Sequence, residues 1–136
     1  MNNILPILAI ETSGDMCSVA VMLAENSFVE MNFLQKHIHS KKIIDMIDCI
    51  LKNSNCDIKD INSIAVSNGP GSFTGLRIGF SAVKGLALGA NLPVISVSTY
   101  DALAFQISKN LPDRTEFIIA NKASVEEIYF SKYSVK

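Results

Sequence analysis

The stretch from residue 61 to residue 90 constrains the fold more than any other part of the sequence. An apolar run at 61–67 ends in the letters NGPG at 68–71, which can only form a tight loop. Apolar residues at helical spacing follow to the end of the stretch, and Ser72 or Thr74 can cap the helix that they predict. We therefore expect a buried strand that turns sharply into a long helix.

The predicted helix carries little side-chain bulk. Its four glycines each cost about 1 kcal/mol relative to alanine in a helix interior, so their presence needs a structural reason. On a helical wheel, one face is apolar and consists of Leu76, Phe80, Val83 and Ala87. A second face is built mainly from small residues, namely Gly75, Ile78, Ala82 and Gly89. We expect the first face to lie on the sheet and the second to let another helix approach closely, from this chain or from a partner.

The rest of the chain alternates in the order of an α/β domain. Three apolar runs separated by turn sequences predict an antiparallel meander, and a helix with one apolar face follows them. A short strand and a third helix, capped by Ser98 or Thr99, come after the long helix. The predicted strands are 4–11, 18–24, 27–33, 61–67 and 94–97, then 116–120 and 128–133; the predicted helices are 40–52, 73–90 and 100–109.

This order predicts a ribonuclease H-like α/β fold. Such a fold has a mixed sheet with helices on both faces, in which right-handed crossovers follow an antiparallel pair of hairpins. We expect residues 1–112 to form this first lobe. Residues 113–136 contain two strands but no helix that could cover them, and we expect them to be the start of a shortened second lobe.

The composition of the chain excludes several classes of protein. Hydrophobic residues make up 49% of it and charged residues 18%, as in one compact domain. A net charge of -1 provides no field that would hold nucleic acid directly. The apolar runs are shorter than the roughly 20 residues needed to cross a bilayer. Three cysteines without a C-x-x-C pair fit reduced thiols, so we expect a cytoplasmic protein without a zinc site.

The loop at 68–75 lies between a strand and a helix, where backbone N–H groups and the helix dipole attract anions. It lacks the closing Lys-Ser or Lys-Thr of a Walker A loop and the spacing of a G-x-G-x-x-G motif. A sharp turn that requires glycine and proline explains most of its composition, and a phosphate site is the alternative.

The longest motif of the chain carries a family resemblance. The string GPGSFTGLRIG at 69–79, with AIETS at 9–13 before it and VST at 97–99 after it, resembles the TsaB (YeaZ) family. Further matches are CSVA at 17–20, HS at 39–40, KGLA at 84–87 and EIY at 127–129. The resemblance covers nearly the whole chain and implies the fold of the actin-like ATPase superfamily.

The resemblance implies a non-catalytic subunit of the bacterial complex that makes N6-threonylcarbamoyladenosine (t6A) in tRNA. The catalytic partner in that complex is TsaD, which carries a His-x-x-x-His metal motif, whereas this chain has only His37 and His39. TsaE joins the larger complex, and tRNA would be reached only through these partners. No cofactor is expected for the chain alone, with ATP or ADP bound only within the complex. We expect neither a catalytic residue nor a metal ligand in this chain.

The resemblance also implies which residues contact a partner or a nucleotide. The family pairs with TsaD, or with a second copy, through its first two helices. The residues predicted at this interface are His39, Ile43, Ile47, Gly75, Ile78, Gly79, Ala82 and Gly89. The end of the first strand and the glycine loop match positions that contact nucleotide in actin-like ATPases. The predicted remnant of a nucleotide site consists of Glu11, Thr12, Ser13, Gly69 and Gly71.

Two other functions stand as alternatives. One is an enzyme, either a nucleotide-binding hydrolase or a metallopeptidase-like protein of the glycoprotease family. The other is a homodimer in which the strands at 116–133 pair with a second copy and so cover their free edges.

Overall fold

The computed structural model describes residues 4–34 and 39–136, without the side chains of His39 and Lys41. The strands are β1 (Ile7–Glu11), β2 (Met16–Ala24), β3 (Ser27–Leu34), β4 (Ser63–Ser67), β5 (Val94–Val97), β6 (Glu116–Lys122) and β7 (Ile128–Ser134). The helices are α1 (His39–Asn53), α2 (Phe73–Ala90) and α3 (Thr99–Ser108), and a short 3-10 helix spans Ile58–Asp60. Among the described residues, no helix is both long enough and apolar enough to cross a membrane.

The predicted order of strands and helices is confirmed. α2 and β5 have the predicted bounds. Ser72 caps α2 by accepting a hydrogen bond from the N–H of Gly75 at 3.1 Å, and Ser98 caps α3 by accepting one from the N–H of Asp101 at 3.2 Å. β1 begins at Ile7 and not at residue 4, because the proline at position 6 has no N–H to donate to a strand ladder.

Five strands form one mixed sheet in the order β3-β2-β1-β4-β5. β2 pairs antiparallel with β1 and β3, whereas β4 pairs parallel with β1 and β5. Near the centre, Ala9 lies opposite Ala20 on one side and Ala65 on the other. The carboxyl ends of β1, β4 and β5 therefore meet at one edge of the sheet, where the loop before α2 begins.

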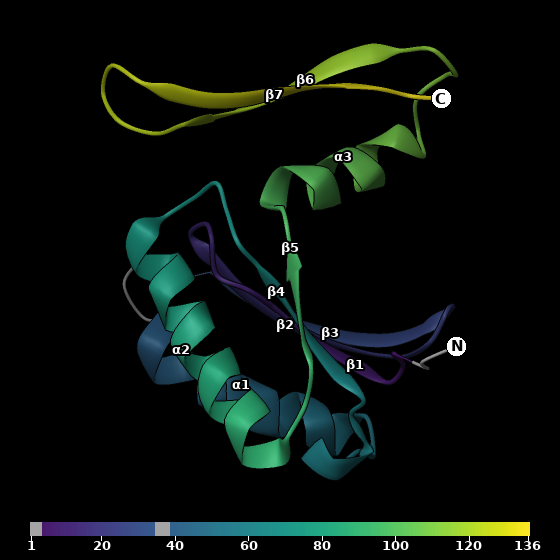
Figure 1. The fold of residues 1–136 in the computed structure, drawn as a ribbon, viewed down its shortest axis with the longest axis vertical. Coiled ribbons are helices and arrows are strands. Elements are labelled where there is room, and N and C mark those ends of the chain that lie inside the picture. The colour runs from purple at the N-terminus through teal and green to yellow at the C-terminus, as the bar shows by residue number, and fades with distance from the viewer. Residues whose placement is uncertain (1–3, 35–38) are drawn as a thin grey trace.

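The two faces of this sheet are covered unequally. Side chains alternate along each strand, and the face that carries Leu8, Ile10, Ile64 and Val66 is buried. α1 and α2 lie side by side on this face (Figure 1). α3 approaches the opposite face only near Ala102, so that most of that face has no helix over it among the described residues. The predicted mixed sheet with helices on both faces is confirmed, with much the larger cover on one side.

β6 and β7 form a separate antiparallel hairpin that lies above α3 (Figure 1). Ile119 of β6 packs against Tyr100 and Ala104 of α3 in a small second core. The hydroxyl of Tyr133 donates to Asp101 Oδ1 at 2.8 Å and so ties β7 to the same helix. The boundary predicted at residue 112 falls in the turn between α3 and β6. That residues 113–136 begin a second lobe stays a prediction.

Cys17, one of the three cysteines, is a core residue of β2. Burial, and next the negative charge of Glu11, raise the pKa of its thiol. Because a higher pKa keeps the thiol protonated near neutral pH, Cys17 acts as a small apolar side chain.

The core assignment predicts a contrast between two isoleucines. Ile64 is fully buried in β4, whereas Ile44 of α1 is largely exposed. Ile64→Ala should lower the free energy of unfolding by about 2–5 kcal/mol, because it removes apolar contacts and leaves a cavity. The control Ile44→Ala should change it by about 0.5 kcal/mol or less. Urea denaturation measures both, and equal losses would contradict this account of the core.

Candidate partner-docking surface

The side of α2 that lies on the sheet is its glycine side. Gly75, Gly79 and Val83 are its buried residues, and the two glycines lie directly on Thr12, just after β1. A Cβ at Gly75 would overlap the carbonyl oxygen of Thr12, and a Cβ at Gly79 would overlap Thr12 Oγ1. The Thr12 hydroxyl donates a hydrogen bond to the carbonyl of Gly75 at 2.7 Å. Glycine at these two positions therefore lets α2 approach the end of β1.

The helical wheel placed the face of α2 that meets the sheet only in part. Val83 of the predicted face is buried and Ala87 packs against the core, but Phe80 is 40% exposed. Gly75, assigned to the opposite face, is buried, as is the predicted interface residue Gly79. The physical reason is that residues 12–13 lie under α2 and leave no room for larger side chains there. A sequence signal for this contact existed, because Gly71, Gly75 and Gly79 recur every four residues and so lie in one line along a helix and its first turn.

The loop before α2 is fastened to the same end of β1. The N–H of Ser72 donates to the carbonyl of Ser13 at 2.6 Å, and a Cβ at Gly71 would overlap that carbonyl. Gly69 has a φ of 100°, a conformation that favours glycine, and its carbonyl accepts from the N–H of Thr99 at 2.9 Å. The loop thus holds the ends of β1 and β5 as well as the start of α2.

The residues predicted as a remnant nucleotide site lie together, but they contact one another. A phosphate at a helix N-terminus needs backbone N–H groups that point toward it. The N–H of Ser72 is engaged by Ser13, the N–H of Gly75 by the Ser72 hydroxyl, and the N–H of Ser13 by the carboxylate of Glu11. These three hydrogen bonds join β1 to α2. A nucleotide contact at this loop stays a prediction.

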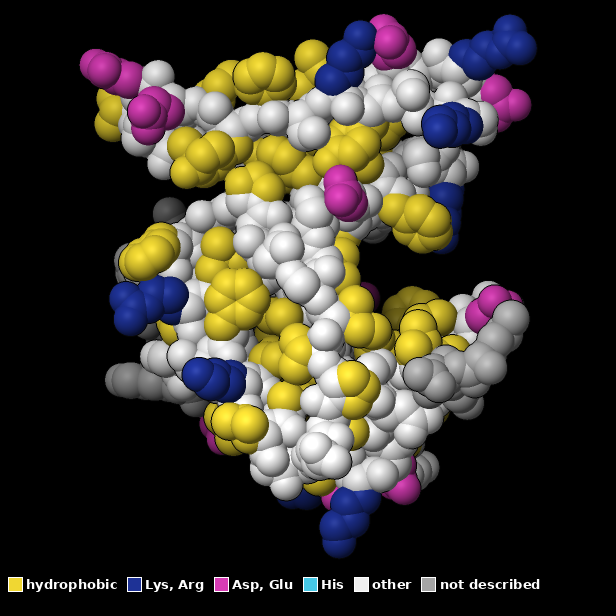
Figure 2. Space-filling model, in the orientation of Figure 1, with side chains coloured by type: hydrophobic (Ala, Val, Ile, Leu, Met, Phe, Trp, Pro, Cys, Tyr) yellow, Lys and Arg dark blue, Asp and Glu magenta, His cyan; other side chains and the backbone are white. Residues whose placement is uncertain are grey.

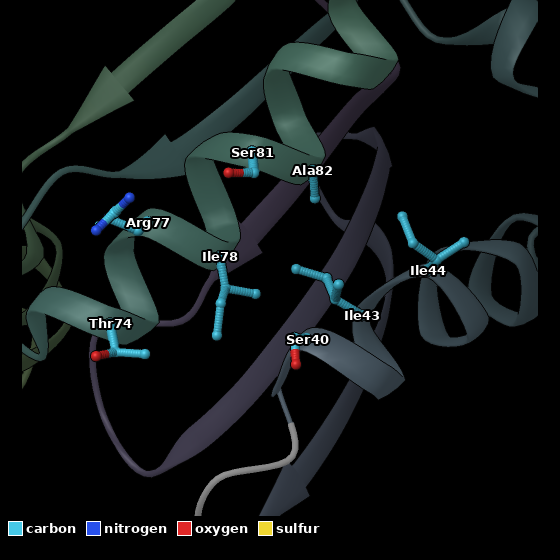
Figure 3. A pocket seen from close by; sticks show the side chains of 8 residues that line it. All are labelled: Ser40, Ile43, Ile44, Thr74, Arg77, Ile78, Ser81 and Ala82. Atoms are coloured by element: carbon cyan, nitrogen blue, oxygen red, sulfur yellow. The ribbon is translucent and has the colours of Figure 1, made fainter.

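A groove of about 580 Å³ lies between α1 and α2. Ile43 of α1 and Ile78 of α2 point toward one another across it, and Ala82 lies on the same side of α2 (Figure 3). Ile44, which is 55% exposed, adds a further apolar side chain from α1. The other lining residues are Ser40, Thr74, Arg77 and Ser81. The groove therefore has an apolar floor between three small hydroxyl side chains and one arginine.

Positive charge is found next to the groove. Arg77 lies on the side of α2 farther from α1 (Figure 3), and its guanidinium is 5.4 Å from the ring centre of Phe73. Such a cation–π contact holds the arginine along the helix surface. Figure 2 shows hydrophobic side chains and Lys or Arg side chains alternating over α2. No acidic residue is present among the described residues that line the groove.

The predicted interface residues do not lie together on one surface. Ile78 and Ala82 line the groove and are partly exposed, whereas Ile43 lines it from below as a core residue that is 2% exposed. Ile47, Gly75 and Gly79 are buried within the chain, so their placement on a partner surface was wrong. Gly89 is exposed near the C-terminal end of α2 but does not line the groove. The side chain of His39 and the whole of His37 lie outside the described residues.

Comparison with known proteins agrees with this architecture. The sequence model of one family, "TsaD: tRNA N6-adenosine threonylcarbamoyltransferase", matches residues 33–135. A tRNA threonylcarbamoyladenosine biosynthesis protein TsaB from Haemophilus influenzae is 41% identical over 94% of this chain and 53% of its own length. The TsaB protein of Escherichia coli is also 41% identical, over 93% of this chain and 54% of its own length. The chain thus spans about half the length of these relatives.

Solved structures give the same result. YeaZ from Pseudomonas aeruginosa superposes with a TM-score of 0.86 at 28% identity, over 96% of this chain and 60% of that protein. Thermus thermophilus RuvC superposes with a TM-score of 0.51 at 11% identity over 72% of this chain and 66% of that protein, which shows a shared fold only. The chain is thus a ribonuclease H-like domain of the actin-like ATPase superfamily. Within it, the chain belongs to the TsaB (YeaZ) family.

The contact between α2 and Thr12 predicts opposite effects for two glycine-to-alanine changes in one helix. Gly75→Ala should lower the free energy of unfolding by about 1–3 kcal/mol or more, because the added methyl group meets backbone that cannot move aside easily. Gly85→Ala should raise it by up to about 1 kcal/mol, because a Cβ there meets nothing within 4 Å and alanine favours the helix. Thermal and urea denaturation check both variants. A destabilising Gly85→Ala together with a neutral Gly75→Ala would show that the contact with Thr12 does not require glycine at position 75.

Proposed function

We propose that this chain is a non-catalytic accessory subunit in the synthesis of t6A in tRNA and that it docks on TsaD through the groove between α1 and α2. The pathway is supported by its relatives, which are named as biosynthesis proteins for this modified nucleoside. The docking site is supported by one observation above all. Ile44 and Ile78, one from each of two neighbouring helices, line an open groove above the buried Ile43, and the rest of the described chain does not fill it.

The groove is suited to a helix from the partner. An amphipathic helix binds a groove of this kind by inserting apolar side chains spaced three or four residues apart. Ala82 and the serines at 40 and 81 are small, so a partner helix can approach the two helices closely. Arg77 stands beside the apolar floor and would pair with a carboxylate on the partner.

The accessory role rests on what the whole sequence offers for catalysis. The chain contains two histidines, spaced by one residue, where the resemblance gives the catalytic partner a His-x-x-x-His motif. A net charge of -1 gives no net attraction to the phosphates of tRNA, so contact with tRNA would come through TsaD. In this proposal TsaE joins the TsaD-bound complex, any ATP or ADP is bound there and not by the chain alone, and the chain acts in the cytoplasm.

The docking proposal predicts a difference between two exposed hydrophobic residues. Ile44→Glu places an unpaired charge inside the docked groove, and it should weaken binding to the TsaD of the same organism at least about tenfold, or by about 1.4 kcal/mol. Leu88→Glu is a matched control, because Leu88 is also exposed but lies outside the groove. The affinity of the Leu88→Glu variant for TsaD should stay within about twofold of that of the unchanged chain.

Isothermal titration calorimetry with purified TsaD gives both affinities, and circular dichroism confirms that each variant is folded. Equal affinities for Ile44→Glu and the unchanged chain would overturn the docking site. Absence of any binding between the two unchanged proteins would overturn the docking proposal as a whole.

A further inference from the structure

The sheet face opposite α1 and α2 has a hollow of about 320 Å³. Figure 2 shows the molecule hollowed below α3, on the side away from these helices. Glu11 at the end of β1, Ser67 at the end of β4 and Val97 at the end of β5 all line this hollow. These strands run parallel, and in open α/β sheets ligands bind outside the carboxyl ends of such strands. The location of the hollow therefore favours a binding site. This site does not depend on docking to TsaD.

Two hydroxyl groups at this edge are buried without a hydrogen-bond partner among the described residues. They are Ser67 Oγ, in a residue that is 8% exposed, and Thr99 Oγ1, in a residue that is 9% exposed. Ser67 lies next to Glu11, because the register of the parallel pair places the preceding residues, Val66 and Ile10, opposite one another. A buried polar group without a partner costs about 1–3 kcal/mol. A polar group from outside the chain would remove this cost at Ser67.

The charge of the hollow indicates the sign of its ligand. Glu11 and Glu30 both line it, and none of the described lining residues is basic. One carboxylate oxygen of Glu11 accepts from the N–H of Ser13, and one of Glu30 accepts from Asn32 Nδ2 at 2.8 Å. Each carboxylate keeps a second oxygen that can accept a further hydrogen bond. Two negative charges, with no basic residue among the described lining residues, attract a cation and repel a phosphate.

The floor of the hollow indicates the shape of the ligand. Ala20, Ala9 and Ala65 lie in one row across β2, β1 and β4, and Glu30 on β3 continues the row. Methyl groups in register form a flat apolar surface that suits a chain of methylene groups. The two acceptors Glu11 and Ser67 lie near one end of this row, and Glu30 lies at the other end.

We propose that this hollow binds a primary alkylammonium ion, with its methylene groups on the alanine row and its ammonium group at Glu11 and Ser67. An ammonium group has three donors, and the carboxylate of Glu11 and the hydroxyl of Ser67 accept two of them. The same chemistry is found in a free aliphatic diamine and in a lysine side chain. A diamine places its second ammonium group toward Glu30.

The test is an NMR titration of the ¹⁵N-labelled chain with 1,4-diaminobutane and, separately, with Nα-acetyl-lysine amide. We expect saturable shifts at the amides of Ala9, Glu11, Ala65 and Ser67 with at least one of the two amines. Tighter binding of the diamine identifies a free diamine as the ligand type, and tighter binding of the lysine derivative identifies a lysine side chain. Inorganic phosphate and Mg²⁺ are the comparison ions, and stronger shifts of the same amides by either ion would overturn the proposal.

Two variants and one control locate the site. Glu11→Gln should weaken amine binding about fivefold or more, since it removes the charge while glutamine still accepts from Ser13. Ser67→Ala should weaken binding as well, yet raise the melting temperature of the free chain, because it removes a buried hydroxyl without a partner. Glu25→Gln lies outside the hollow and should leave binding unchanged. Unchanged binding in both Glu11→Gln and Ser67→Ala would overturn the proposal.

Discussion

The contact between Thr12 and the glycines of α2 determines how the rest of the first lobe is arranged. α2 can lie on the end of β1 because Gly75 and Gly79 have no Cβ to overlap Thr12. The hydrogen bond from the Thr12 hydroxyl to the carbonyl of Gly75 and that from the N–H of Ser72 to Ser13 fix the helix along its axis. Four glycines in one helix cost several tenths to about 1 kcal/mol each, and at these two positions the close approach explains that cost.

This contact has a consequence for function, because it decides which side of α2 is free. With the glycine side on the sheet, Ile78 and Ala82 turn toward α1 and form one wall of the groove, while α1 adds Ile43 and Ile44. The glycine side that lies on Thr12 and the side proposed to meet TsaD are therefore different, while Ile78 and Ala82 also pack against the core. Substitutions at the buried glycines would change the fold first, and only substitutions at the groove report on docking.

Much of the fold could be predicted from the sequence, since its signals are local. The NGPG turn, the Ser72 cap and the helical spacing of apolar residues gave the bounds of α2, and three apolar runs gave the meander. Part of the groove was also predictable, because Ile78 and Ala82 do line it, with the buried Ile43 beneath them. The burial of Gly75 was missed, since its contact with Thr12 joins residues 63 positions apart in the chain, and the recurrence of glycine every four residues was the one local signal for it. A helical wheel compares side chains within a helix and contains no information about the strand end beneath it. The unpartnered hydroxyl of Ser67 likewise becomes visible only when β1, β4 and β5 are brought together.

A double-mutant cycle between Thr12→Ala and Gly79→Ala tests the central contact most directly. In the unchanged chain, Gly79→Ala should lower the free energy of unfolding by about 1–3 kcal/mol, because the new Cβ meets Thr12 Oγ1. In the Thr12→Ala chain the nearest remaining atom would be the Cβ at position 12, at 3.6 Å, which is an ordinary contact. There, Gly79→Ala should be neutral or stabilise the chain by up to about 1 kcal/mol, as alanine does in an unobstructed helix. The same loss in both backgrounds would contradict the claim that the Thr12 side chain is the reason for glycine at position 79.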